Sequence, residues 1–233
     1  KAVAVMRKIL ILCYDFPPLP SIGAQRPASF FRHLPQYGFH PVIITRKWKD
    51  NITSQIEYFE GDGGREEIKE TGFSTLIKIP ERQSLKNKLL VKYGVENFKL
   101  LRKIITLTEL IFKWIIPITH DKYYICKKAK AYLQNNKVDF ILATGEPFIL
   151  FKYGYLLSKK FNIPLVLDYR DGWTTNHTVS NSPVNNLRFR FESLFEKRYI
   201  NRAIFFSSVS EGVINEIENK YNLSLAKRFL LKN

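Results

Sequence analysis

The sequence predicts an α/β fold with a mostly parallel sheet and helices on both faces. Apolar segments of strand length alternate with segments of helical spacing along most of the 233 residues. The strand-like runs are continuously apolar, as expected for strands buried on both faces. Polar turns that contain glycine or proline follow several of these runs. Strict alternation of this kind indicates a Rossmann-like, doubly wound sheet in a single domain.

The first half begins with a predicted βαβ unit. The run RKILILCY at 7–14 predicts a strand, and a proline-rich loop follows it. Residues 24–38 have helical spacing and end at Gly38, a residue suited to a helix C-cap. The segment PVIIT at 41–45 predicts the second strand, which completes the unit.

The middle of the chain is less regular. Residues 46–75 are polar and rich in glycine, so we expect a long loop there, and residues 74–80 predict a third strand. Residues 85–134 predict a long helical region, broken near Gly94, Pro117 and His120.

The second half returns to regular alternation. Predicted strands at 138–144, 164–171 and 203–210 each precede a predicted helix, at 146–162, 184–201 and 211–222. Pro147 stands near the start of one helix, where proline is tolerated. Ser210 is the expected N-cap of the last helix, with Glu211 in its first turn. The domain is expected to span 6–233, with residues 1–5 a leader or remnant outside it.

The formal net charge is +16, which suggests an anionic partner. Nucleic acid, a phosphorylated substrate and an anionic membrane surface all fit, as does a lysine-rich surface without a specific partner. Two cysteines are too few for a disulfide framework, so a cytoplasmic location is expected.

Residues 98–117 combine a wide apolar arc with several charged side chains, which argues against a transmembrane span. The favoured interpretation is a helix packed against the sheet with one solvated edge. The alternative is an interfacial helix that attaches the protein peripherally to the anionic inner face of the plasma membrane.

Unusual residues cluster where the predicted strands end. In open α/β sheets, ligands bind beyond the carboxyl ends of the strands. Asp168 and Asp171 flank Arg170 after one buried run, a costly group to bury without a role. Gly23 directly precedes a helix whose backbone N–H groups could face an anion, and Arg26 follows as a phosphate clamp or an ordinary surface residue.

Three stretches together resemble the N-terminal domain of a GT-B fold glycosyltransferase of the family 4 type. They are YDFPPLPSIGAQR, VDFILATGEPFILFKYGYLLSKKFNIPLVLDYRDGW and SSVSEG. The resemblance covers nearly the whole chain. It implies transfer of a sugar from a nucleotide-sugar donor to a saccharide or lipid-linked acceptor, in bacterial surface polysaccharide synthesis, with no metal and no cofactor. In that family a C-terminal domain holds most of the donor, and this chain lacks it, so the chain alone is expected to be inactive.

The resemblance also suggests site residues. Some family members carry a histidine before the Glu-Pro pair, but Gly145 stands there in this sequence. Asp171 is therefore the expected general base, with Asp168 holding Arg170, and His177 is a weaker alternative. The residues expected to contact donor or acceptor are Gly23, Arg26, Gly145, Glu146, Asp168, Arg170, Trp173, Ser210 and Glu211.

Each of these assignments has a plainer alternative. Asp168 could be a strand-end cap that only orders its loop. Trp173 could stack on a sugar or simply pack in the core. No spacing of His, Cys or carboxylates suggests a metal site. Two other functions stay open: a GT-B-type sugar-nucleotide epimerase, and a basic nucleic-acid-binding module, although no nucleic-acid motif occurs.

Overall fold

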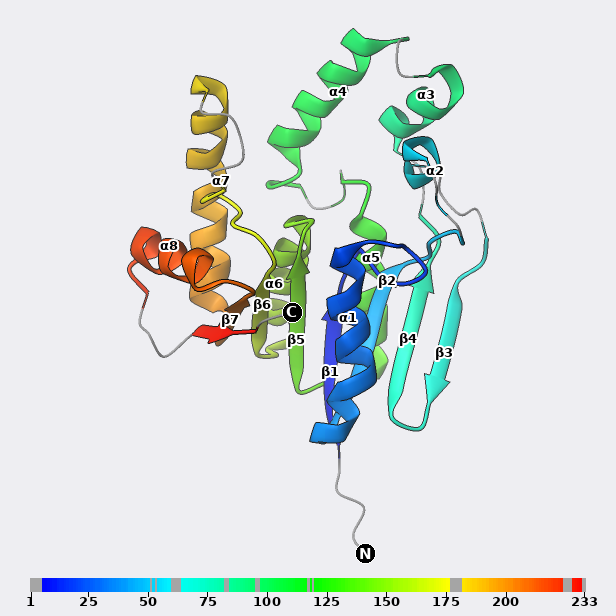
Figure 1. Ribbon diagram of the computed structural model, residues 1–233, viewed down its shortest axis with the longest axis vertical. Coiled ribbons are helices and arrows are strands. Elements are labelled where there is room, and N and C mark those ends of the chain that lie inside the picture. Colours follow the sequence, from blue (N-terminus) through cyan, green and yellow to red (C-terminus); the bar gives the residue numbers. More distant parts are fainter. Residues whose placement is uncertain are drawn as a thin grey trace, which may run out of the picture.

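The protein is built on one eight-stranded sheet (Figure 1). Its strand order is β3-β4-β2-β1-β5-β6-β7-β8, and every neighbouring pair is parallel except β3 and β4. The predicted α/β, Rossmann-like fold class is therefore confirmed. The computed structural model describes residues 6–50, 52, 54–59, 64–81, 84–94, 97–116, 118, 120–176, 182–223 and 228–231.

The elements follow the predicted alternation. The strands are β1 (Arg7–Leu12), β2 (Phe39–Arg46), β3 (Glu67–Thr71), β4 (Ser74–Ile79), β5 (Phe140–Gly145), β6 (Leu165–Tyr169), β7 (Phe205–Ser208) and β8 (Arg228–Leu230). The helices are α1 (Ile22–His33), α2 (Gln55–Phe59), α3 (Leu85–Tyr93), α4 (Lys99–Phe112), α5 (Tyr123–Asn135), α6 (Ile149–Phe161), α7 (Pro183–Arg202) and α8 (Glu211–Tyr221).

The core lies on both faces of the sheet, because successive side chains of a strand point to opposite sides. In β1, Ile9 and Ile11 pack in the cluster that α1 covers. Leu10 and Leu12 belong to the larger cluster, to which α5 and α6 contribute. A strand apolar on both sides must be covered on both sides, which explains the continuous apolar runs.

Side-chain caps set several helix starts. The Oγ of Ser21 accepts the N–H of Ala24 at the start of α1. Ser210 caps α8 in the same way through the N–H of Val213, so its predicted N-cap role is confirmed. Gly38, at φ 77°, ends the short 3₁₀ helix Leu34–Tyr37 that follows α1, as the sequence predicted.

The predicted loop over residues 46–75 is wrong in part. Helix α2 and strand β3 lie within it, and β3 pairs antiparallel with the edge of the parallel sheet. All five residues of β3 are exposed, so the strand has no apolar pattern to reveal it. Strand β8 was also not predicted; it too is short and mostly exposed.

Helix α4 does not pack on the sheet, so the favoured interpretation of residues 98–117 is wrong. It lies beside α3, beyond the carboxyl ends of the strands (Figure 1). Leu100 is 73% exposed and Ile104 is 52% exposed. No helix within the described ranges is both long enough and apolar enough to cross a membrane.

Candidate functional site

One arginine joins three loops at the carboxyl edge of the sheet. The Nε of Arg170, after β6, donates to the carbonyl of Gly145 at 2.7 Å. Its Nη2 donates to the carbonyl of Glu146 at 3.3 Å, in the loop after β5. Its Nη1 lies 3.5 Å from Oδ2 of Asp15, in the loop after β1. Arg170 thus fixes the loops that follow three adjacent parallel strands.

At the start of α1, Gly23 packs closely against this arginine. A Cβ on Gly23 would lie 1.6 Å from Nη1 of Arg170 and 2.6 Å from Oδ2 of Asp15. The Oγ of Ser21 also donates to Asp15, at 3.3 Å. The absence of a side chain at Gly23 thus lets Arg170 approach this closely, a reason that the sequence alone did not indicate.

A pocket of about 300 Å³, here called the polar pocket, lies beside Arg170. Charged groups of both signs line it, namely Asp15, Asp121, Glu146, Lys122 and Arg170. Burial raises the pKa of Asp15, against the opposing Arg170 charge. Partial burial also raises the pKa of Glu146, and the nearby Asp171 carboxylate raises it further. Such shifts are typical of groups that exchange protons.

A buried polar network supports the polar pocket from below. Nη1 of Arg46 lies 2.7 Å from Oε2 of Glu81 and 2.7 Å from the hydroxyl of Tyr14. That hydroxyl donates to Oε1 of Glu81 at 2.9 Å. The guanidinium also stacks 3.8 Å from the centre of a Trp48 ring. A buried ion pair with such additional partners holds Tyr14 rigidly at the pocket wall.

Asp168 does not hold Arg170, so that expectation is wrong. Its side chain is 0% exposed, and Oδ1 lies 2.8 Å from Nη2 of Arg26. Ser207 donates to the same oxygen at 2.7 Å. Arg26 is 7% exposed and also donates to the carbonyl of Leu231 at 3.1 Å. Arg26 therefore faces inward from α1 toward β6, and it has little surface to offer a phosphate.

Asp171 is exposed two residues beyond β6, and its charge acts on Glu146. Ser210 and Glu211, after β7, are exposed at the start of α8. Among the described residues, neither has a hydrogen bond or ion pair to Arg170 or its partners. His177 lies outside the described residues, as do residues 1–5.

Gly145 is the last residue of β5, and an aromatic ring fills the space that a side chain at this position would need. A Cβ there would lie 2.6 Å and 2.7 Å from two ring carbons of Phe148, and 3.1 Å from Phe151. No larger residue fits without moving these rings. The position that carries histidine in some members of the resembled family is thus closed to a side chain here.

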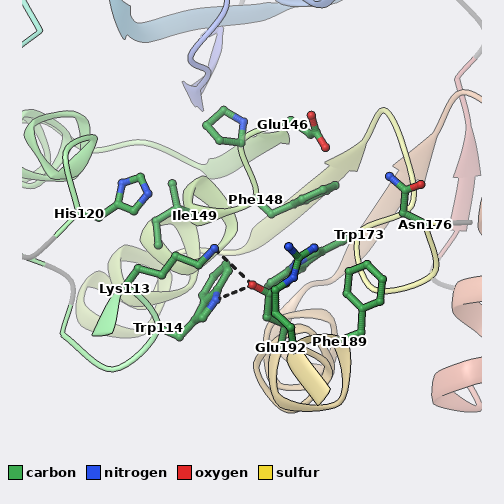
Figure 2. Close-up of a pocket in the computed structure, with 12 residues that line it drawn as sticks. Lys113, Trp114, His120, Glu146, Phe148, Ile149, Trp173, Asn176, Phe189 and Glu192 are labelled. Atoms are coloured by element: carbon green, nitrogen blue, oxygen red, sulfur yellow. Dashed lines mark hydrogen bonds and ion pairs between the residues drawn. The ribbon is translucent and has the colours of Figure 1, made fainter. Parts of the chain in front are cut away.

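A second pocket of about 270 Å³ shares Glu146 and Pro147 with the polar pocket. Figure 2 shows its lining. It is called the indole pocket, after Trp114 and Trp173 in its wall. Both indole nitrogens donate to the buried carboxylate of Glu192, at 3.0 Å and 2.9 Å.

Trp173 is a packing residue in this wall. It is 4% exposed, and Phe148 stacks on it with centroids 5.3 Å apart and planes 8° apart. Trp114 lies against it at 4.7 Å. The rings of Trp173 are thus largely covered, which favours a packing role over direct stacking on a sugar.

Within the described ranges, no group of three or more His, Cys, Asp or Glu side chains is placed to hold a metal ion. Cys13 and Cys126 are both buried thiols. Burial raises the pKa of each to about 12, so neither is a ready nucleophile.

Sequence reasoning missed Asp15, the Arg46–Glu81 pair and Glu192. Asp15 directly follows the first apolar run, so its place at a strand end was a usable signal. Glu81 and Glu192 gave no such signal: Arg46 lies 35 residues from Glu81, and Trp114 and Trp173 lie 78 and 19 residues from Glu192.

Comparison with solved structures supports the fold. The chain is similar to the catalytic domain of starch synthase IV from Arabidopsis thaliana, bound to ADP and acarbose, with a TM-score of 0.52 and 11% identity. The match covers 98% of this chain and 52% of that one.

It is also similar to α,α-trehalose 6-phosphate synthase from Burkholderia multivorans, with a TM-score of 0.51 and 12% identity, over 96% of this chain and 45% of that one. The chain thus spans about half the length of both. No known sequence family and no curated protein sequence matches it.

Proposed function

We propose that this chain is the acceptor-side, N-terminal half of a GT-B glycosyltransferase of the family 4 type. The observation that carries the proposal is the polar pocket, where Arg170, in the loop after one strand, binds the loops after two others beside Glu146 and Asp15. Ligands of open α/β sheets bind at this edge. The similarity to half of two sugar-transferring synthases supports the same assignment.

The proposed reaction is attack of an acceptor hydroxyl on the anomeric carbon of a nucleotide sugar. The bond from that carbon to the nucleotide phosphate breaks, and the hydroxyl proton passes to a carboxylate. The proposed base is Asp171, which is exposed and close enough to Glu146 to alter its pKa. Glu146 is the competing carboxylate, because it lines the polar pocket directly.

The nucleotide is proposed to bind mainly to a second domain outside this chain. In this half, the Gly23 loop would lie near the donor phosphate or the acceptor, because the N-terminal end of a helix favours an anion. The chain alone is then expected to turn over no nucleotide sugar and to bind such donors weakly. Micromolar binding in calorimetry would show that the donor site is misplaced.

The proposed setting is the synthesis of a bacterial surface polysaccharide or its lipid-linked precursor, at the cytoplasmic face of the membrane. Two features support peripheral attachment: the exposed apolar side chains of α4 and the net charge of +16. Basic proteins with exposed apolar helices are attracted to anionic lipids.

The test uses the complete polypeptide, with this chain joined to the proposed donor domain. Common UDP-, GDP- and ADP-sugars are supplied with and without saccharide acceptors, and released nucleoside diphosphate is measured. Release that depends on the acceptor supports the proposal. Conversion of the donor sugar without an acceptor would identify an epimerase instead.

A further inference from the structure

The indole pocket has no part in the reaction proposed above, yet it is a built cavity. Segments far apart in sequence line it: the stretch after α4, the start of α6, the loop after β6 and the first turns of α7 (Figure 2). Its volume of about 270 Å³ lies just below the range of about 300–1,000 Å³ of typical small-molecule sites. It therefore suits a single ring better than a nucleotide.

The wall of this pocket is preorganised around Glu192. The buried carboxylate accepts both indole N–H groups, and Nζ of Lys113 lies 3.3 Å from Oε1. Because a carboxylate is costly to bury without partners, this arrangement locks both indole rings. A rigid wall binds a ligand without a further ordering cost.

The lining combines apolar rings with polar groups. Phe148 and Phe189 contribute partly exposed rings, while Asn176 and Glu146 contribute polar atoms. A pyranose has the same duality, with C–H bonds on its faces and hydroxyls at its edge. A purely apolar ligand would instead leave the polar lining without water or partners.

The charges of the lining balance. Lys113 and Arg188 supply two positive charges, and Glu146 and Glu192 supply two negative ones. Burial lowers the pKa of His120, which keeps this histidine neutral near pH 7. Nε of Arg188 already lies 3.9 Å from Oε2 of Glu192. A balanced lining of this kind favours an uncharged ligand over a phosphate or a uronate.

We propose that the indole pocket binds one neutral pyranose ring of the acceptor, the unit next to the one that reacts in the polar pocket. This inference rests on the proposed function, because Glu146 and Pro147 form a wall common to both pockets. One saccharide chain crossing that wall would occupy both.

The three indole N–H signals in an NMR spectrum test the inference on this chain. Those of Trp114 and Trp173 report on the indole pocket, while that of Trp48, bonded to the carbonyl of Tyr14, reports on the polar side. Methyl glycosides of neutral hexoses and N-acetylhexosamines should shift the first two saturably. No saturable shift with any of them, or stronger shifts with glucuronic acid, glucose 6-phosphate or uridine, would overturn the inference.

Two variants on α7 make a matched pair. Phe189→Ala removes a ring that lines the pocket, and Phe191→Ala removes one that packs on Phe195 instead. Phe189→Ala should weaken the apparent affinity about tenfold, as expected for loss of a ring contact. Phe191→Ala should keep the affinity of the parent chain; equal effects of the two would count against the site.

The complete enzyme separates this inference from the proposed function. Transfer that is indifferent to Phe189→Ala at limiting acceptor would refute the subsite and leave the glycosyltransferase standing. Sugar binding in the indole pocket without transfer to any acceptor would refute the glycosyltransferase and leave a carbohydrate site.

Discussion

The guanidinium of Arg170 occupies the space that a side chain at position 23 would need. A Cβ on Gly23 would lie 1.6 Å from Nη1 and 2.7 Å from Cζ of that arginine. The same arginine holds the carbonyls of Gly145 and Glu146. A methyl group added at position 23 would therefore displace Arg170, and with it the loop that carries the Glu146 carboxylate.

Gly23→Ala should displace Arg170 and leave the fold intact, because the nearest atoms belong to a flexible side chain. The free energy of unfolding should fall by about 1–3 kcal/mol, the usual cost of overpacking. The Nε–H of Arg170 should lose its protection from hydrogen exchange. Gly212→Ala, also at the second position of a helix, has only Ser210 Oγ near, at 3.3 Å. It should change stability by less than about 0.5 kcal/mol; an unaltered Arg170 signal in Gly23→Ala would contradict the coupling.

Arg26→Gln should destabilise the protein strongly. It leaves the fully buried Asp168 carboxylate with Ser207 as its remaining partner among those described. Breaking one side of a buried pair typically costs about 3–5 kcal/mol. The control is Arg32→Gln, an exposed position of the same helix, which should change stability by about 0.5 kcal/mol at most. Urea unfolding measures both; a stable Arg26→Gln that loses donor binding in the complete enzyme would restore the phosphate-clamp role.

Asp171→Asn in the complete enzyme should reduce turnover by about 10²–10⁴, the usual contribution of a general base. Melting temperature should change little, because Asp171 is exposed. A structural role would give the reverse, with stability lost and the rate per folded molecule kept.

Glu146→Gln and a pH profile separate the two carboxylates. The Asp171 charge raises the pKa of Glu146, so Asp171→Asn should lower that pKa. If Glu146 were the base, Asp171→Asn would keep most of the rate and move the acid limb of the profile to lower pH. A large rate loss in Glu146→Gln alone would transfer the role to Glu146.

Glu196 should make stability depend on pH. It is fully buried, and Tyr221 and Thr174 donate to its Oε2. Burial raises its pKa above the ordinary 4.5. A raised carboxyl pKa gives stability that is complete below the ordinary value and is lost as pH rises through the folded value.

The free energy of unfolding of the parent protein should therefore fall relative to Glu196→Gln as pH rises from about 4.5. The slope should not exceed about 1.4 kcal/mol per pH unit, the limit for one proton. Urea titrations of both proteins across pH 4–8 measure the difference. Parallel pH curves would show that Glu196 keeps its ordinary pKa.

Membrane attachment should depend on α4. Leu100→Ser should reduce flotation with anionic liposomes, and flotation of the parent chain should exceed that with neutral liposomes and fall with salt. Phe73→Ser is the matched control, an exposed apolar residue in the β3–β4 turn at the opposite end of the molecule (Figure 1). Salt-sensitive binding to duplex DNA without liposome binding would favour the nucleic-acid alternative.

The sheet could be predicted because β1, β5 and β6 are apolar on both faces. Continuous runs such as ILIL and FILA have no other stable environment in a chain of this size. Strands β3 and β8 could not be predicted, because their stability comes from hydrogen bonds to neighbouring strands and not from side-chain burial. The position of α4 could not be predicted either, because its wide apolar arc fits a helix packed on the sheet and an exposed amphipathic helix equally well.

The sequence predicted where the candidate site lies but not which charged residues pair within it. Strand ends indicated Arg170, Glu146 and Asp168 without showing which charges meet. Asp168 pairs with Arg26 and Arg170 with Asp15, across 142 and 155 positions of sequence. Partners so far apart meet because of the strand order β1-β5-β6 and the place of α1 beside it, which a single sequence does not reveal.

The ring of Phe148 over Gly145 also constrains the order in which this site can change. The Cβ of a histidine at position 145 would lie 2.6 Å and 2.7 Å from two carbons of that ring. Phe148 would have to become smaller first, and it also stacks on Trp173. Replacing Gly145 alone should be disruptive, whereas the same replacement after a change at Phe148 should be tolerated. We therefore expect the two positions to form an epistatic pair, in which a histidine at position 145 is tolerated only together with a smaller residue at position 148.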